Sequence, residues 1–123
     1  MNRPTTSVFT EAVDIDSTAV DLANATAVYT VPANFMARVV YLHISNGGAN
    51  NKKVSINFFH AKDSQDKLLL DEFAMSANSV HDIVSNGTML YLKAGDKIEA
   101  FMESGGDFHI CISLELYPET GYY

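Results

Sequence analysis

From Phe108 to Tyr117 the chain alternates strictly between apolar residues and residues of mixed polarity. A period of two residues is typical of a β-strand with one buried face, because successive side chains of a strand point to opposite sides. A helix has a period of 3.6 residues and would scatter these apolar side chains around its axis. The segment therefore predicts a strand, and it favours an all-β fold over a helical one.

The rest of the chain contains further short β-prone runs, separated by turns rich in Gly, Asn, Pro and Asp. Runs of this kind at spacings of roughly 8 to 12 residues are typical of a sandwich or a barrel. The run around Leu68 to Leu70 fits a strand or a short helix, and we favour the strand. We therefore expect an all-β fold, an antiparallel β-sandwich that is jelly-roll-like with about eight strands. The expected strands cover residues 28–31, 36–45, 53–60, 67–73, 80–84, 89–92, 97–103 and 108–117.

The strand expected over residues 36–45 is apolar on both faces, so one of them must contact something besides solvent. Strict alternation assigns the side chains to two faces, with Val40, Leu42 and Ile44 on one and Val39, Tyr41 and His43 on the other.

Residues 1–26 differ from the rest because they are rich in Thr, Ala, Asp and Ser and carry few apolar side chains. Such a segment buries little surface on its own. It is either a partly disordered terminus or an extended arm that orders against a neighbouring subunit. We expect an extended N-terminal arm over residues 1–26 and a β-sandwich domain over residues 27–123.

Length and charge exclude several classes of protein. A chain of 123 residues fits one domain with its own core. It has no apolar run near the roughly 20 residues of a membrane helix, so we expect no membrane partner. Its start lacks the apolar core of a cleavable signal, so we expect no export by that route. A net charge of −7 opposes binding to a phosphate backbone, so we expect no nucleic acid partner.

Residue chemistry offers no catalytic or cofactor motif. The four histidines, His43, His60, His81 and His109, are each alone in sequence, whereas a cupin metal site needs two histidines one residue apart with a glutamate close behind. There is no Gly-x-Ser-x-Gly motif, and the single Cys111 has only His109 nearby. We expect no catalytic residue, no cofactor and no metal. Because histidines can converge in space, a cupin-like metalloenzyme stays as the least favoured alternative.

Aromatic residues are more numerous than one face of a thin sandwich can bury. Tyrosine is enriched at protein interfaces because its ring is apolar while its hydroxyl can still form hydrogen bonds. We therefore predict an interface built from these aromatics and from the apolar side chains of the arm. The candidate interface residues are Val8, Phe9, Val13, Ile15, Tyr29, Tyr41, Phe59, Tyr117, Tyr122 and Tyr123.

Three elements carry a family resemblance. They are the run Tyr29-Thr-Val-Pro-Ala33, the strand from Arg38 to Asn46, and the later Leu92-Lys-Ala-Gly95-Asp96. Over residues 28–117 the chain resembles small β-sandwich proteins of tailed bacteriophages, which are capsid decoration (cement) proteins and accessory tail or neck components. Asn34 stands where these proteins usually have glycine, a change the backbone tolerates. The Gly-Asp element also occurs in tumour-necrosis-factor-like jelly rolls, which are trimers.

The resemblance implies a virion structural protein without enzymatic activity, assembled in the cytoplasm of a bacterial host. Its partners would be other virion proteins, either the major capsid protein or tail and neck proteins, bound through the N-terminal arm and one face of the sandwich. It also implies a homo-oligomer, for which a trimer is the expectation. The alternatives are an accessory tail, neck or fibre protein and a carbohydrate- or receptor-binding module on the same scaffold.

Overall fold

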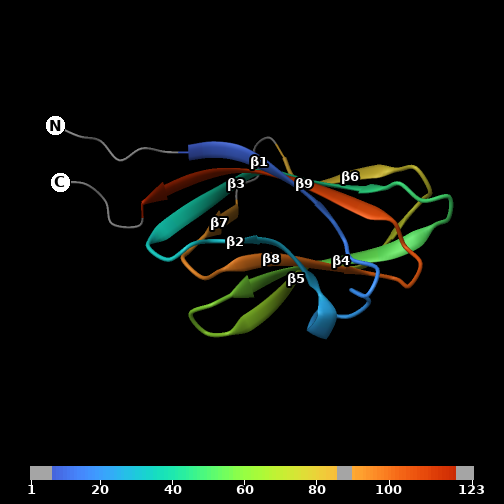
Figure 1. Ribbon diagram of the computed structural model, residues 1–123, viewed down its shortest axis with the longest axis horizontal. Coiled ribbons are helices and arrows are strands. Elements are labelled where there is room, and N and C mark those ends of the chain that lie inside the picture. Colours follow the sequence, from blue (N-terminus) through green and yellow to red (C-terminus); the bar gives the residue numbers. More distant parts are fainter. Residues whose placement is uncertain (1–6, 86–89, 119–123) are drawn as a thin grey trace.

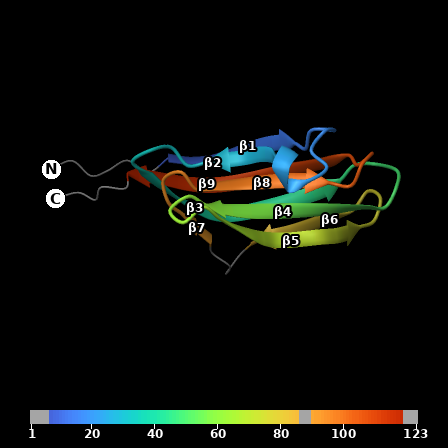
Figure 2. The ribbon, with the colours of Figure 1, turned by 90° about the horizontal axis from the view of Figure 1, so that it is seen from below.

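The computed structural model describes residues 7–85 and 90–118, which form two β-sheets packed face to face (Figures 1 and 2). One short 3₁₀ helix, η1 (Leu22–Asn24), precedes the second strand. The strands are β1 (Ser7–Asp14), β2 (Thr26–Thr30), β3 (Phe35–Asn46), β4 (Lys52–His60), β5 (Gln65–Met75), β6 (Val80–Val84), β7 (Leu90–Leu92), β8 (Lys97–Met102) and β9 (Phe108–Pro118).

The order of strands is that of a jelly roll. Sheet A runs β1-β9-β3-β6 with β7 also paired to β3, and sheet B runs β2-β8-β4-β5. Each paired set of strands is antiparallel, and most connections cross from one sheet to the other. Strands β6 and β7 pair with successive stretches of β3, so together they fill one position beside it. The expected antiparallel jelly-roll sandwich is confirmed, with nine strands in the described residues filling eight positions.

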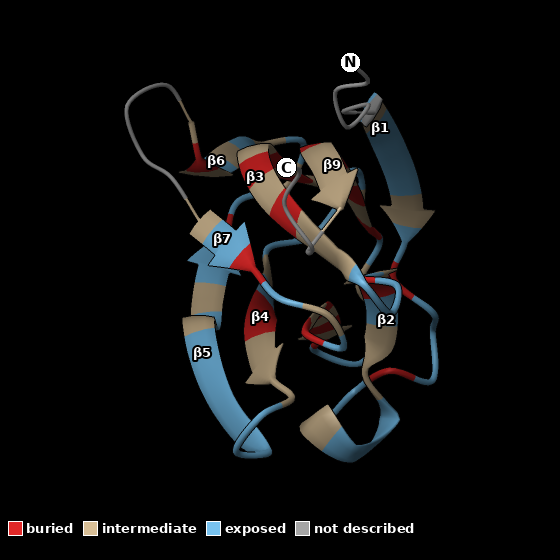
Figure 3. Ribbon diagram, turned by 90° about the vertical axis from the view of Figure 1, so that its left-hand side faces the viewer, coloured by how far each residue is buried: buried red, intermediate tan, exposed pale blue. Residues whose placement is uncertain are grey.

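The core lies between the two sheets and is built mostly from aliphatic side chains. Figure 3 colours the buried stretches of the strands red. In β9 the inward residues Phe108, Ile110, Ile112 and Leu114 are at most 1% exposed, and Leu116 near the end of the strand is partly buried. Burying a side chain of this size stabilises the fold by about 1.5 to 3 kcal/mol. The sequence pattern of β9 therefore reports the inner face of sheet A correctly.

The N-terminal segment departs from the arm that we expected over residues 1–26. From Ser7 to Asp14 it is strand β1, which pairs with β9 along its whole length without a register shift. Behind β1, Ile15 and Ala19 are buried in the core, 6% and 0% exposed. Within the described residues this segment is thus part of the sandwich. Composition does not reveal β1 because the strand is defined by its pairing with β9, which joins residues far apart in the chain.

A β-bulge in β3 corrects the expected assignment of faces. The pairing with β9 shifts between Val39 and Tyr41, which makes Val40 an extra residue. Val39 is therefore inward together with Leu42 and Ile44, all 0% exposed, while Tyr41 and His43 face outward. Strict alternation grouped Val39 with Tyr41 and His43, and Val40 with Leu42 and Ile44. The grouping was wrong because the bulge at Val40 restarts the period, so that Val39 shares the inward face of Leu42 and Ile44.

The other expected strands are confirmed to within a few residues at their ends. The run around Leu68 is strand, as favoured, and belongs to the longer β5. Residues 86–89, which include the first residue of the strand expected over 89–92, lie outside the described residues.

Two motif elements of the family resemblance meet around the buried Asp96. Its carboxylate accepts hydrogen bonds from the backbone N–H of Ala61 at 2.9 Å and of Lys93 at 2.8 Å. The Val31 N–H donates to the Asp96 carbonyl at 2.9 Å, and the Gly95 N–H donates to the Val31 carbonyl at 3.0 Å. The Gly-Asp element therefore fastens the loop after β7 to the chain after β2 and β4, which is a structural role.

Candidate interaction surface

The ten candidate interface residues fall into separate groups in the structure. Three of them, Val8, Tyr41 and Tyr117, lie on the outer face of sheet A. Phe59 lies on the outer face of sheet B, where the Lys97 ammonium sits 5.0 Å from its ring centre. Tyr122 and Tyr123 lie outside the described residues. The remaining four, Phe9, Val13, Ile15 and Tyr29, pack in or against the core.

The inward group closes one edge of the sandwich. The rings of Phe9 in β1 and Tyr29 in β2 lie 5.8 Å apart at an interplanar angle of 54°, and so bridge the two sheets. Burial raises the pKa of the Tyr29 hydroxyl, with the charge of Glu11 acting in the same direction. Ile15 is covered by its own protein and cannot insert into a partner without unfolding this edge.

The outer face of sheet A is a broad surface of cross-strand rows, and we call it the sheet A face. Outward positions of neighbouring strands face each other directly, as in the row Ala12, Cys111, His43 and Asp82. The sheet A face comprises Val8, Thr10, Ala12 and Asp14 of β1, Met36, Arg38, Tyr41, His43 and Ser45 of β3, Val80 and Asp82 of β6, Tyr91 of β7, and His109, Cys111, Ser113, Glu115 and Tyr117 of β9.

Small side chains occupy its middle, and charged pairs surround them. The hydroxyls of Thr10 and Ser113 share a hydrogen bond of 2.8 Å. The guanidinium of Arg38 donates to the carboxylate of Glu115. Apolar side chains project most at Val8, Val80 and Tyr91, which are 69%, 64% and 53% exposed.

One polar cluster on the sheet A face joins β3 to β6. The Tyr41 hydroxyl donates to Asp82 Oδ1 at 3.0 Å, and His43 Nδ1 lies 2.7 Å from the same oxygen. The hydrogen bond with His43, and then that with Tyr41, lowers the pKa of the Asp82 carboxyl. Desolvation raises the pKa of the Tyr41 hydroxyl, and the hydrogen bond to Asp82 adds to the rise. The carboxylate is thus held ionised and is a poor proton acceptor.

The cross-strand neighbours of Cys111 differ from His109, the residue that lies near it in sequence. Its partners across the strands are Ala12 and His43, while His109 lies two residues away along β9. Within residues 7–85 and 90–118 the thiol has no hydrogen bond to a histidine.

A second polar cluster ties the end of β1 to β9. His109 Nδ1 lies 2.6 Å from Asp14 Oδ1, and Nε2 lies 3.2 Å from Asp107 Oδ1. The hydrogen bond with Asp14 raises the pKa of the His109 imidazole, and the nearby Asp107 charge adds to the rise. A protonated His109 therefore bridges two carboxylates from different segments.

The four histidines are dispersed over the fold. His43 lies beside Asp82 and His109 beside Asp14, as above, while His60 Nδ1 is 3.2 Å from Asp96 Oδ1. His81 instead stacks on Phe73, with ring centres 4.5 Å apart. In the part of the chain that the structure describes, no group of three His, Cys, Asp or Glu side chains could hold a metal ion.

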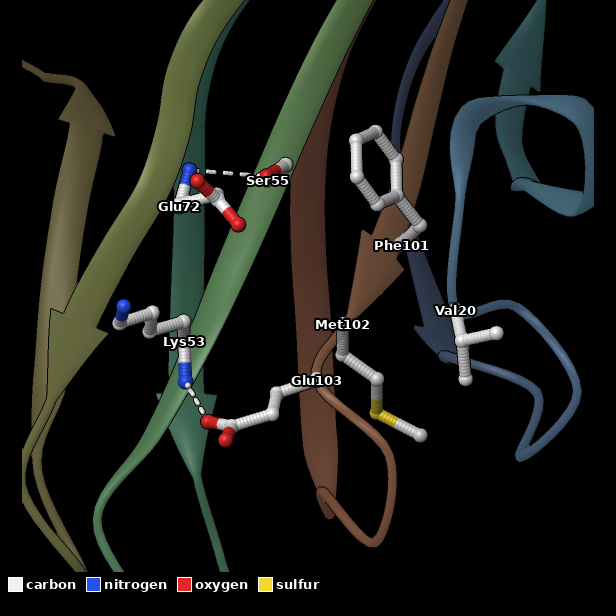
Figure 4. A pocket seen from close by; sticks show the side chains of 7 residues that line it. All are labelled: Val20, Lys53, Ser55, Glu72, Phe101, Met102 and Glu103. Carbon is white, nitrogen blue, oxygen red and sulfur yellow. Dashed lines mark hydrogen bonds between the residues drawn. The ribbon is translucent and has the colours of Figure 1, made fainter.

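Sheet B carries a shallow pocket of about 160 Å³ on its outer face (Figure 4). Phe101 is the one aromatic residue that lines it, beside Glu72, Lys53 and Ser55. The Glu72 N–H donates to the Ser55 hydroxyl at 2.9 Å. Pockets for small organic ligands usually measure about 300 to 1,000 Å³, so this hollow is small for such a ligand.

Comparison with known proteins gives a likeness of fold. No family model matches the sequence, and no curated protein matches it. A chain in the structure of infectious bursal disease virus, Gx strain, superposes with a TM-score of 0.56 at 12% identity, over 99% of this chain and 34% of that one. This chain thus spans about a third of the viral protein's length.

A second solved structure matches over nearly the whole of both chains. It is a protein of Bacillus endospore appendages, described as disulfide-linked pili, with a TM-score of 0.53 at 11% identity over 97% of this chain and 93% of that one. A chain of the cyanophage Pam1 capsid matches at a TM-score of 0.43 and 12% identity, over 94% of this chain and 86% of that one. At such identities the first two likenesses establish a shared all-β sandwich fold.

Sequence reasoning missed several residues of the sheet A face, among them Arg38, Asp82 and Tyr91. Their common position follows from the register of β3 with β6, β7 and β9. No local pattern carries that register, because it depends on pairings between residues far apart in the chain. Finally, no helix among the described residues is long and apolar enough to cross a membrane.

Proposed function

We propose that this protein is a non-enzymatic structural component of a virus particle, and specifically a capsid decoration protein that binds the shell through the sheet A face. The observation that carries the proposal is the character of that face. Its charged side chains have partners within the protein: Arg38 pairs with Glu115, and the Asp82 carboxylate is hydrogen-bonded to Tyr41 and His43. A partner can therefore cover the face without burying an unpaired charge, which is the costly step in forming an interface.

The fold supports the same proposal without deciding it. Jelly rolls serve as viral capsid domains, lectin domains and cupins, so the architecture fits a virion protein and also fits others. The family resemblance of residues 28–117 points to tailed bacteriophages. A decoration protein acts in many copies, and modest affinity per copy is enough when a symmetric shell offers many equal sites.

A subunit of a fibre is the second candidate, favoured by the match to the pilus protein over 93% of that chain. Those pili are disulfide-linked. The 123 residues here contain one cysteine, the half-buried Cys111 in the middle of β9. A chain of subunits in which each is bonded to two neighbours needs at least two cysteines per subunit, so a fibre of this protein alone would be held together without disulfides.

The direct test is the composition of purified particles. Particles from cells that carry this gene are banded on a density gradient, and the number of copies of this protein per particle is measured by quantitative mass spectrometry. We expect many copies per particle, in a fixed ratio to the major capsid protein. Finding the protein only in the free fraction, or as a filament of its own, contradicts the proposal.

A pair of variants tests the surface. In Ser113→Arg a long charged side chain projects from the middle of the sheet A face, and we expect binding to particles to fall at least tenfold. Leu68→Arg is the matched control, because Leu68 is 44% exposed on β5 of the other sheet. Both variants should keep the circular dichroism spectrum of the wild type. Equal binding by both would remove the sheet A face from the proposal.

A further inference from the structure

The four edges of the two sheets are protected to different degrees. An open edge offers unpaired backbone N–H and C=O groups to another strand, and proteins usually blunt it with charges, bulges or short strands. The edge of sheet B at β5 is blunted by two register shifts against β4 and by Glu72, whose backbone φ is 48°. The edge at β2 is five residues long with a register shift between Ala27 and Tyr29.

The far edge of sheet A is also poorly suited to pairing. It consists of the five-residue β6 and the three-residue β7, and β6 has its own register shift against β3. Strand β1 differs from all of these. It is eight residues long, pairs with β9 without a shift, contains no proline or lysine, and has no further strand on its other side among the described residues.

We propose that β1 is a self-association edge, along which a second copy of this chain adds its own β1 antiparallel to form a twofold dimer. The edge fits this occupant because its sequence is self-complementary in one register. A twofold antiparallel pair must centre on a residue, since facing side chains lie on the same side of the sheet. Centring on Glu11 would set two carboxylates directly opposite each other, which is destabilising.

Centring on Thr10 avoids that conflict and aligns residues 7–13 of the two strands. Thr10 then faces Thr10 of the second copy, and Val8 faces Ala12 on the sheet A face, while Glu11 faces Phe9 on the other side. Threonine pairs and aliphatic pairs are favourable neighbours across strands. Centring on Phe9 also separates the acidic groups, but it aligns only residues 7–11 of β1.

The dimer would join the two copies of sheet A into one continuous sheet. In Figure 3, β1 lies at the margin of the molecule, away from β5, β6 and β7, with its outer side unobstructed by any other labelled strand. The half-buried Phe9 and Tyr29 rings lie at this same edge, and a second copy would cover them further. The proposal does not depend on the function proposed above, and it predicts a dimer where the family resemblance suggested a trimer.

Sedimentation equilibrium over a range of protein concentrations tests the proposal. The wild-type chain should show a monomer–dimer equilibrium. Thr10→Lys sets two ammonium groups opposite each other only in the dimer, and should raise the dissociation constant at least tenfold. Leu68→Lys adds the same charge on the edge strand β5 of sheet B and should leave the constant unchanged. Wild-type protein that stays monomeric at every concentration, or that forms a trimer, overturns the proposal.

A charge-pair experiment tests the register independently of how well Thr10→Lys folds. Val8→Lys with Ala12→Asp puts a lysine opposite an aspartate twice in the dimer centred on Thr10, while the two sites are far apart within one copy. The double variant should dimerise at least as tightly as the wild type at low salt, and more weakly as salt is added. If dimerisation responds neither to these charges nor to salt, the register centred on Thr10 is wrong. If a folded Thr10→Lys variant dimerises as tightly as the wild type, the dimer does not form along β1.

Discussion

Among the described residues, Asp96 is the one ionisable side chain that is fully buried, at 2% exposure. Its carboxylate accepts from the backbone N–H groups of Ala61 and Lys93, which would otherwise lack a partner. Gly95 beside it has a φ of +86°, and a Cβ there would lie 3.0 Å from the Cβ of Ala61. Sequence patterns find this Gly-Asp turn readily, but they do not show that it holds three loops together.

We predict that Asp96→Ala lowers the free energy of unfolding by about 3 kcal/mol, since two part-buried backbone donors lose a buried, charged acceptor. Asp96→Asn keeps one acceptor oxygen and should cost about half as much. Urea denaturation at neutral pH measures both. Equal stability of the alanine variant and the wild type would show that these N–H groups find other partners and that the turn does not depend on the carboxylate.

His109 gives a pH dependence whose sign follows from its raised pKa. Because the pKa in the folded protein lies above its ordinary value of 6.5, the protonated imidazole stabilises the junction of β1 and β9 fully below pH 6.5. That contribution is lost as the pH rises through the higher pKa of the folded state. We expect the NMR titration of His109 to show a pKa above 6.5, and the pKa to fall toward 6.5 in Asp14→Asn.

Asp107 also faces His109, so the fall in Asp14→Asn should be incomplete, and adding Asp107→Asn should complete it. A pKa of His109 at or below 6.5 in the wild type contradicts the bridge to Asp14. The same result would mean that the contact between His109 and Asp14 holds β1 to β9 less tightly than their separation of 2.6 Å indicates.

At the scale of elements, the sequence predicts the strands well and their faces less well. The turns and the alternation in β9 fix where most strands begin and end, because both signals are local. The bulge at Val40 has no local signal in the sequence, since it depends on how β3 pairs with β9. The composition of residues 1–26 predicts an arm because their apolar side chains are sparse, and the pairing of β1 with β9 leaves no local signal in the sequence.

Two substitutions distinguish a docked β1 from a free arm. Ile15 is 6% exposed within its own protein, so Ile15→Ala should lower the free energy of unfolding by about 3 kcal/mol. Val8 is 69% exposed, so Val8→Ala should change it by no more than about 0.5 kcal/mol. Thermal or urea denaturation of both variants provides the comparison. If Ile15→Ala is as stable as Val8→Ala, the segment does not pack as the structure shows.

Deleting residues 1–26 is therefore a poor probe of an arm. The deletion removes β1, Ile15 and Ala19, and it leaves β9 as a new open edge of sheet A. We expect the shortened protein to be much less stable and to aggregate, whatever the oligomeric state of the full chain. A shortened protein that melts at the same temperature as the full chain would contradict the role given to β1.

At the scale of the whole molecule, the sequence predicts the architecture and only part of the candidate surface. Of the candidate interface residues, Val8, Tyr41 and Tyr117 lie on the sheet A face, while Phe9 and Tyr29 pack against the core. Composition cannot separate the two groups, because an aromatic side chain suits a core and an interface equally well. Only the register of the strands shows which side each residue faces.

The decoration role proposed above is tested most directly by adding the purified protein back to virus particles that lack it. Particles are assembled from a genome in which this gene is deleted, and purified protein is added at increasing concentrations. Bound copies are measured after sedimentation, together with the temperature at which the particles break. We predict saturable binding and particles that survive to a higher temperature. Particles that bind no protein, and break at the same temperature with or without it, would contradict the account.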